Sequence, residues 1–224
     1  MIKKLFKITL LACFICFSLS SPTDFPPSIK VYAESLCPDT INFIVNSFGG
    51  FREFKDRSKL LKSIDFIIFG NASEDPESTE GNRKFKCQHG DKECYGNKLQ
   101  NCSNKYLPSD LYEEYLICFS RSVKLVGRDK ADLNIITAEC SEASKEIIEC
   151  ANSSEGDELL HNAGLNTGSH NYVPYIIVND KYNINYQKEA ESNLLKFLCD
   201  YSRESGHSFP SCDFIEFSRV KHLR

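Results

Sequence analysis

The sequence predicts an α/β domain that is interrupted by a disulfide-rich helical insertion. Three observations support this fold class. Short apolar runs rich in β-branched residues predict strands near both ends of the chain. The segment from about residue 84 to residue 168 has the apolar spacing of helices, and it carries six of the cysteines. We therefore expect one domain over residues 28–224, with the insertion at about 84–168.

The first part of this domain is predicted to be a strand–helix–strand unit. Residues 29–33 alternate between apolar and polar side chains, which is typical of a strand. Apolar residues over 41–48 have helical spacing, and Gly49 and Gly50 end that helix. The short apolar run 64–69 fits a buried strand. A unit of this kind predicts a parallel pair of strands.

The middle of the chain is predicted to be a surface loop followed by the insertion. Residues 70–83 are rich in Asp, Glu, Ser and Asn, which is typical of a loop. Within the insertion, helical spacing is clearest at 111–125 and 138–151. Because the apolar content of this segment is modest, we expect disulfides to stabilise it.

The last part is predicted to contain two strands and a helix. Residues 172–178 form an apolar run that includes Pro174, and Asn179-Asp180 predicts a turn after it. Residues 182–184 are expected to return as a strand, and 189–201 have the pattern of an amphipathic helix. The resulting order, β-α-β, insertion, β-β-α, is typical of a thioredoxin-like domain.

Residues 1–20 have the features of a signal peptide. A basic start precedes an apolar stretch from Ile8 to Leu19, which is too short to span a membrane, and small residues follow. An uncleaved signal anchor is the alternative. No later segment is long and apolar enough to span a membrane, and the net charge of −4 is scattered, so neither a nucleic acid nor a membrane surface is an expected partner. We expect a secretory-pathway protein, destined for the lysosome, the endosome or the extracellular space.

The cysteine count singles out one residue. Of the 11 cysteines, Cys13 and Cys16 lie in the expected signal peptide, which leaves an odd number. With Cys37 set aside, eight cysteines can close as four structural disulfides: Cys87, Cys94, Cys102, Cys118, Cys140, Cys150, Cys199 and Cys212. Spacing does not fix their connectivity, but Cys199 and Cys212 flank the end of the last predicted helix, so we expect them to pair. A monomer and a disulfide-linked dimer both fit the odd count.

The run Cys37-Pro38-Asp39-Thr40 lies where the first predicted helix begins. A thiol at a helix N-terminus faces unpaired backbone N–H groups and the positive end of the helix dipole, so its thiolate is favoured. Thr40 stands where a dithiol site has its second cysteine, which resolves the mixed disulfide. The Thr40 hydroxyl can donate a hydrogen bond to the thiolate, whereas the Asp39 carboxylate disfavours it, and the sequence leaves open which effect dominates.

Pro174 opens the late strand directly after Val173. In a thioredoxin-like domain this is the place of a cis-proline beside the active cysteine, where the preceding backbone can pair with an extended substrate. We therefore expect a cis Val173–Pro174 bond and a role for Pro174 in the site. A trans proline at the start of a strand is the alternative.

The most distinctive string runs from Cys87 to Cys102 as Cys-Gln-His-Gly-Asp-Lys-Glu-Cys, with Asn97 and Cys102 following. By spacing alone, Cys87, His89, Cys94 and Cys102 could hold zinc. In an oxidising compartment we expect disulfides instead, and no metal.

The pattern CQHGxxECxxNxxxxC resembles the signature of the gamma-interferon-inducible lysosomal thiol reductase family. The runs Tyr32–Pro38, Phe69–Ala72, Phe85–Cys87 and Tyr172–Asn179 extend the resemblance over nearly all the mature chain. It implies a thioredoxin-like fold with a helical insertion, a glycosylated protein of the endosomal–lysosomal route, and reduction of protein disulfides at acidic pH. The first cysteine of the family's site corresponds to Cys37, and the second corresponds to Thr40.

Three Asn-x-Ser sequons are candidate glycosylation sites, at Asn71, Asn101 and Asn152. Asn71 lies in the polar loop and is the expected acceptor. Glycosylation of Asn101 competes with disulfide formation at Cys102, and Asn152 lies close after Cys150.

The sequence thus predicts a thiol–disulfide oxidoreductase that acts on protein disulfides through one thiol. Its catalytic candidates are Cys37, Thr40 and Pro174. No cofactor is expected, and a small-molecule thiol would serve as reductant. Two alternatives are a module that captures thiol or disulfide partners without turnover, and a structural protein in which Cys37 is inert.

Overall fold

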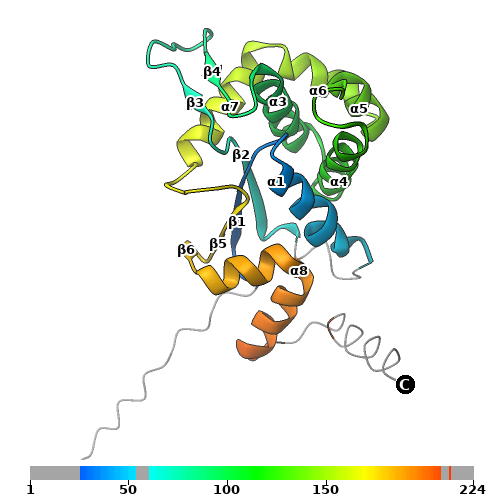
Figure 1. The fold of residues 1–224 in the computed structure, drawn as a ribbon, viewed down its shortest axis with the longest axis vertical. Helices are drawn as coiled ribbons and strands as arrows, with labels where there is room; N and C mark the ends of the chain where they lie inside the picture. Colours follow the sequence, from blue (N-terminus) through cyan, green and yellow to red (C-terminus); the bar gives the residue numbers. More distant parts are fainter. Residues whose placement is uncertain (1–25, 54–60, 208–211, 213–224) are drawn as a thin grey trace, which may run out of the picture.

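A computed structural model of the chain describes residues 26–53, 61–207 and 212. The expected signal peptide at 1–20 lies outside these residues. Within them, the chain forms a mixed α/β structure with a small sheet, a group of helices and four disulfides (Figure 1). No helix among the described residues is both long enough and apolar enough to cross a membrane.

The main sheet has the strand order β2-β1-β5-β6. Strand β1 (Ile29–Ala33) pairs in parallel with β2 (Ile64–Ile68), as the strand–helix–strand pattern predicts. Its other edge pairs antiparallel with β5 (Tyr175–Val178), which in turn pairs with β6 (Lys181–Tyr182). Strand β1 is therefore paired on both edges, and the loop that follows it leaves from the middle of the sheet.

Helices cover both faces of the sheet because β1 and β2 present apolar side chains on each. Alternate residues of β1, among them Ile29 and Val31, pack with Phe43, Phe48 and the last helix in one core cluster. On the opposite face, Tyr32 and Ile67 pack with residues of a helix of the insertion. These contacts fix the carboxyl end of β1, where Cys37 follows.

The first helix begins at the expected point and then changes character. Helix α1 (Pro38–Asn42) continues as a π-helical turn (Phe43–Ser47) and a 3-10 helix (Phe48–Glu53). Pro38 occupies the first turn, where its missing N–H costs no hydrogen bond. Cys37 is the residue that caps this helix at its N-terminus.

Five helices lie between residues 91 and 166, inside the expected insertion. They are α3 (Asp91–Tyr106), α4 (Ser109–Val126), α5 (Leu133–Cys140), α6 (Ser144–Ala151) and α7 (Ser154–Asn166). Figure 1 shows them gathered at one end of the molecule, away from α8 (Ile184–Glu204). They enclose a second core cluster that includes Leu99, Tyr115 and Phe119.

Several boundaries differ from the sequence predictions. Gly49 and Gly50 do not end the first helical segment, because they lie within the 3-10 helix. The strands expected at 172–178 and 182–184 are Tyr175–Val178 and Lys181–Tyr182. The pattern at 138–151 is two helices, because Ser141 is extended and its hydroxyl accepts the Ala143 N–H, which ends α5. The expected loop 70–83 contains β3 (Ser73–Glu74), which pairs with β4 (Phe85–Lys86). Helix α8 starts at Ile184 rather than 189, because Asn183 caps it with two side-chain hydrogen bonds.

The eight cysteines outside Cys37 form four disulfides: Cys87–Cys94, Cys102–Cys150, Cys118–Cys140 and Cys199–Cys212. The last of these is the pairing expected from the sequence. Three disulfides lie within the insertion or at its start, and the fourth ties the end of α8 to Cys212.

Candidate active site

Cys37 lies at the N-terminus of α1 and is the one free cysteine among the described residues. It is buried, with 8% of its surface exposed. Its Sγ is 3.8 Å from the carbonyl oxygen of Val173, and the Val173–Pro174 peptide bond is cis, as expected. The structure therefore brings Cys37 together with the Val173–Pro174 segment, 136 residues away in the sequence.

The protonation of Cys37 results from opposing effects. Burial raises the pKa of the Cys37 thiol above its ordinary value. The backbone N–H groups of Thr40 and Asp39, and the Thr40 hydroxyl, hydrogen-bond the sulfur and lower that pKa, but only in part. The helix N-terminus therefore favours the thiolate, as expected from the sequence, but burial outweighs it and the pKa of Cys37 is raised.

Thr40 is fully buried directly below the thiol. Besides its contact with the Cys37 sulfur, its Oγ1 accepts the backbone N–H of Glu34 at 3.5 Å. The Thr40 hydroxyl thus lowers the pKa of Cys37, in the direction expected from the sequence. Asp39, by contrast, is exposed, and the carboxyl group that raises the pKa of Cys37 is that of Glu34.

The loop between β1 and α1 is held from α3 by residues of the Cys87–Cys102 string. The Ser35 N–H donates to Asn97 Oδ1 at 2.8 Å, and the Ser35 hydroxyl donates to the carbonyl of Glu93 at 3.1 Å. A Cβ at Gly96 would lie 2.5 Å from Ser35 Oγ, so only glycine allows this close approach. The string thus fixes the loop that carries Cys37.

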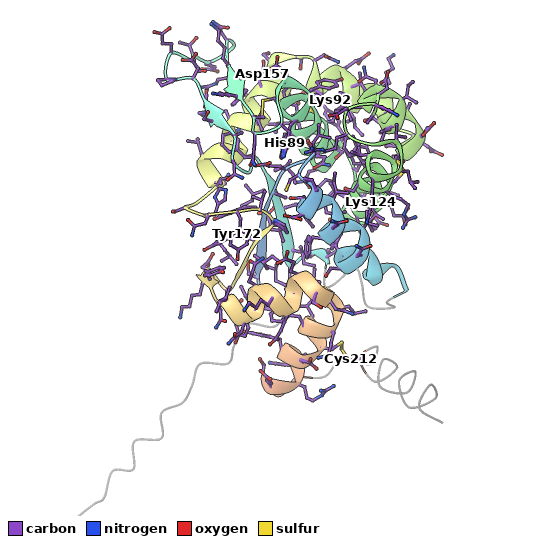
Figure 2. All side chains as sticks on the ribbon, viewed as in Figure 1. His89, Lys92, Lys124, Asp157, Tyr172 and Cys212 are labelled. Atoms are coloured by element: carbon purple, nitrogen blue, oxygen red, sulfur yellow. A yellow bond between two sulfur atoms is a disulfide. The ribbon has the colours of Figure 1, made fainter. Side chains whose placement is uncertain are left out.

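Glu34, His89 and Glu93 form a polar cluster between this loop and α3. Both carboxyl side chains are fully buried. His89 Nδ1 lies 2.5 Å from Glu93 Oε2 and 3.5 Å from Glu34 Oε2. Figure 2 shows His89 near the end of β1, between the sheet and the insertion. The cluster therefore lies beside the loop that leads to Cys37.

Burial and the neighbouring Glu93 carboxylate raise the pKa of Glu34 to about 7, although the backbone N–H of Asn71 lowers it in part. Asn71 N–H donates to Glu34 Oε1 at 2.5 Å. A Cβ at Gly70, whose φ is +58°, would collide with the Glu34 side chain. The backbone of residues 70 and 71 thus encloses this carboxyl group.

No zinc site forms from the cysteines of the string. Cys87 is bonded to Cys94, and Cys102 is bonded to Cys150, so none of these sulfurs is available to a metal. Glu34, His89 and Glu93 have donor atoms within 4.8 Å of one another. The 2.5 Å separation of His89 Nδ1 and Glu93 Oε2 is that of a hydrogen bond, with a proton between the two atoms.

The three sequon asparagines lie in different surroundings. Asn71 is exposed, and its Nδ2 donates to Gln88 Oε1. Asn101 is half-buried in α3, with Nδ2 donating to the Ile68 carbonyl at 2.8 Å. Asn152 is exposed after α6, with Nδ2 donating to the Tyr95 hydroxyl and the Ile148 carbonyl. Glycosylation of each remains a prediction.

Glu34, Ser35, Asn97 and Gly96 are site residues to which sequence reasoning gave no role. All four lie within the runs that carry the family resemblance, so the signal was present. Only the fold shows that these runs contact one another.

Comparisons with known proteins agree with this geometry. The family model for gamma interferon inducible lysosomal thiol reductase (GILT) matches residues 28–161. The chain is 28% identical over 179 residues to the gamma-interferon-inducible lysosomal thiol reductase of Carassius auratus, covering 78% of this chain and 68% of that protein. To the enzyme of that name from Mus musculus it is 29% identical over 189 residues, covering 81% and 71%.

A third relative is the gamma-interferon-inducible lysosomal thiol reductase-like protein of Anopheles gambiae. It is 32% identical over 191 residues, which cover 76% of this chain and 75% of that protein. The matched region contains the loop with Cys37 and the whole Cys87–Cys102 string. The chain therefore belongs to the gamma interferon inducible lysosomal thiol reductase family.

Proposed function

We propose that the protein is a thiol–disulfide oxidoreductase of thioredoxin-like fold that acts on protein disulfides through Cys37. One observation carries this proposal. Cys37 is the free thiol among the described cysteines, and it lies at a helix N-terminus beside the Val173 carbonyl. The names of the relatives, which describe thiol reductases, support the same chemistry.

The first step is an exchange of sulfur partners. The Cys37 thiolate attacks one sulfur of a substrate disulfide, the substrate S–S bond breaks, and a mixed disulfide forms. The other substrate sulfur leaves as a thiolate and takes up a proton. Hydrogen bonds from the N–H groups of Thr40 and Asp39 stabilise the attacking thiolate. The Val173 backbone lies where an extended substrate would pass the sulfur.

The second step needs a thiol from outside the site, because Thr40 has no sulfur. A small-molecule thiol attacks Cys37 Sγ, releases the reduced substrate and forms a new mixed disulfide with Cys37. A second molecule of that thiol then frees Cys37. In total, one protein disulfide and two small thiols give one protein dithiol and one small-molecule disulfide, so electrons balance without a metal, nucleotide or flavin.

The proposed setting is the secretory route, ending in the lysosome or endosome at acidic pH. Four disulfides in the described chain fit an oxidising compartment. The relatives named lysosomal support the destination. Oxidised, folded proteins are the substrates that such a compartment offers.

A module that captures partners without turnover is the second candidate, and Thr40 favours it. A site with an attacking thiol and no resolving thiol forms a mixed disulfide but does not complete the cycle by itself. The two candidates differ in a single measurable property, which is turnover in the presence of a small thiol.

The test is reduction of insulin disulfides between pH 4 and 7, with a small-molecule thiol present, for wild type and Cys37→Ser. We expect wild type to show multiple turnover with the small thiol and a trapped insulin adduct without it, and Cys37→Ser to show neither. An adduct without turnover would support the capture module. Absence of any adduct from folded wild-type protein would show that Cys37 is inert.

A further inference from the structure

Glu34 differs from Glu93 in how many hydrogen-bond donors surround its carboxyl group. Glu93 Oε1 accepts the backbone N–H of His89 at 2.9 Å, and its Oε2 bonds His89 Nδ1 at 2.5 Å. Glu34 Oε1 accepts one N–H, from Asn71, and its Oε2 is buried with no hydrogen-bond partner. A buried carboxyl oxygen without a donor is the natural position for a proton. Of the two groups, Glu34 is therefore the one that carries it.

The unpartnered oxygen points into the cluster rather than away from it. Glu34 Oε2 lies 3.5 Å from His89 Nδ1, beside the Glu93 carboxylate that His89 already holds. A proton on Oε2 removes one of two buried negative charges that would otherwise lie side by side. The geometry thus favours a neutral Glu34 next to the hydrogen-bonded Glu93–His89 pair.

Glu34 is connected to the thiol by a short path through Thr40. The backbone N–H of Glu34 donates to Thr40 Oγ1 at 3.5 Å, and the same hydroxyl group lowers the pKa of Cys37. A negative charge on Glu34 raises the pKa of Cys37 across this buried, weakly screened path. The other charged groups around the loop are the exposed Asp39 and Arg128, which donates to the Leu36 carbonyl at 3.3 Å.

We propose that Glu34 controls the reactivity of Cys37 through its own proton. In acidic surroundings Glu34 is neutral and does not disfavour the Cys37 thiolate. At higher pH Glu34 is ionised, and its negative charge disfavours the thiolate. The role of this control in catalysis rests on the proposed function. The effect of the Glu34 charge on Cys37 does not depend on that function. The midpoint of the change falls near the pKa of Glu34, which is about 7.

This arrangement suits a thiol that must act in acid. A cysteine with a fixed pKa loses thiolate tenfold for each unit that the pH falls below that pKa. With Glu34, acidification also removes a nearby negative charge, so the loss on going from neutral to acidic pH is smaller. Cys37 would then be less reactive until the protein reaches an acidic compartment.

Glu34→Gln is the discriminating variant, because glutamine resembles the protonated acid. Its Oε1 can still accept the Asn71 N–H, and its amide can donate to Glu93. The experiment measures the alkylation rate of Cys37 by iodoacetamide from pH 5 to 8 on the disulfide-intact protein. The ratio of variant to wild type at each pH cancels the intrinsic pH dependence of the reagent.

We expect Glu34→Gln to react at the wild-type rate at pH 5, and roughly threefold or more faster at pH 8. Asp39→Asn is the matched control, because it removes an exposed carboxylate that is closer to Cys37 in the sequence. Asp39 is exposed and lies outside the cluster, so its ratio to wild type should be the same at pH 5 and pH 8. A purely structural role of Glu34 would give a ratio that does not change with pH.

Stability gives a second readout with a defined sign. Because the pKa of folded Glu34 is raised to about 7, the folded state binds this proton more tightly than the unfolded state. The stabilisation is complete below the ordinary glutamate pKa and is lost as the pH rises through about 7. Wild type should therefore lose more thermal stability than Glu34→Gln between pH 5 and pH 8.

Glu93→Gln is the second variant, in case glutamine at position 34 prevents folding. It removes the charge that disfavours ionisation of Glu34, so suppression of Cys37 should begin at lower pH than in wild type. The proposal is overturned if the Glu34→Gln ratio is equal at pH 5 and pH 8, or if purified protein contains a stoichiometric metal ion at this cluster. Failure of insulin reduction with the expected alkylation profile would reject the proposed function and leave the control of Cys37 standing.

Discussion

The loop that carries Cys37 and the helical insertion are stabilised in opposite ways. The insertion contains the Cys102–Cys150 and Cys118–Cys140 disulfides, which link its helices to one another. The loop contains one free thiol and is held by hydrogen bonds from Ser35 to Asn97 and Glu93. These two disulfides thus stabilise the insertion, whereas the loop with the free thiol relies on buried polar contacts.

Helix α3 joins the two regions. One of its residues, Cys102, is fully buried in a disulfide, while Asn97 and Glu93 on the same helix hold the loop. The insertion therefore supports the loop that carries Cys37, besides being stabilised by its own disulfides. Loosening α3 should therefore change Cys37 more than loosening α4 or α5, which contact the loop only through apolar packing on Leu36.

Removing the Cys102–Cys150 disulfide should have the largest effect. The closed loop spans 48 residues, so the Cys102→Ala/Cys150→Ala variant should lose about 4 kcal/mol of unfolding free energy. Its Cys37 should also alkylate at a different rate, because α3 holds the loop. Urea unfolding and alkylation of the folded fraction measure the two effects.

The Cys118→Ala/Cys140→Ala variant is the control for this experiment. Its loop spans 22 residues, which corresponds to a loss of about 3 kcal/mol, and both cysteines are half-buried. Cys37 should alkylate closer to the wild-type rate in this variant, because α4 and α5 contact the loop only through apolar packing on Leu36, whereas α3 holds Ser35 by hydrogen bonds. If both double variants change Cys37 equally, α3 has no special part in holding the site.

Gly96→Ala should disturb the loop with a smaller cost in stability. The new Cβ would lie 2.5 Å from Ser35 Oγ and 3.3 Å from Leu133 Cδ1, so the loop must shift at a cost of about 1–3 kcal/mol. Insulin reduction should fall, since Cys37 follows Ser35 by two residues. Gly50→Ala, which meets no atom within 4 Å, should change neither property. Full activity of folded Gly96→Ala protein would contradict the support role of α3.

The sequence predicted the parts of this arrangement that depend on local pattern. The strand predicted at 29–33, the Cys37 helix start and the cis Val173–Pro174 bond agree with the structure, and the strand predicted at 64–69 ends one residue earlier. These features follow from apolar periodicity and from proline and cysteine chemistry, which act within a few residues.

The role of Glu34 could not be predicted, because it depends on contacts across the fold. A glutamate in a polar run is normally exposed, whereas here β1 delivers it to a pocket formed by Gly70, Asn71 and α3. Burial also distinguishes the two carboxyl groups near Cys37: Glu34 is fully buried, whereas Asp39, which is closer in sequence, is exposed. Helix ends such as Ser141 and Asn183 were missed because their side-chain caps compete with a stronger apolar pattern.

Thr40→Cys tests the site rather than its support. A sulfur at position 40 would lie one helical turn from Cys37 and could displace the substrate from the mixed disulfide. We expect several-fold less trapped insulin adduct than in wild type, and weaker dependence of substrate release on the small thiol. A reductant is still needed to close the cycle. Thr40→Ser, which keeps the hydroxyl, should behave like wild type in both measurements.

The smallest expected effects come from two of the sequon asparagines. Asn71 lies beside the loop, and Asn101 lies in the insertion. Asn71 is exposed next to the Glu34 pocket, and its contact with Gln88 is made at the surface, so Asn71→Gln should change stability by less than about 0.5 kcal/mol. Asn101 is half-buried in α3 and donates to the Ile68 carbonyl, so Asn101→Ala should cost about 1 kcal/mol.

Asn101 also precedes Cys102, whose disulfide is fully buried. We therefore expect the secreted protein to lose a glycan mass on Asn71→Gln and none on Asn101→Ala. A glycan found on Asn101 would mean that this side chain is accessible to the glycosylating enzyme before the Cys102–Cys150 bond forms. The insertion would then become fully folded later than the loop it supports.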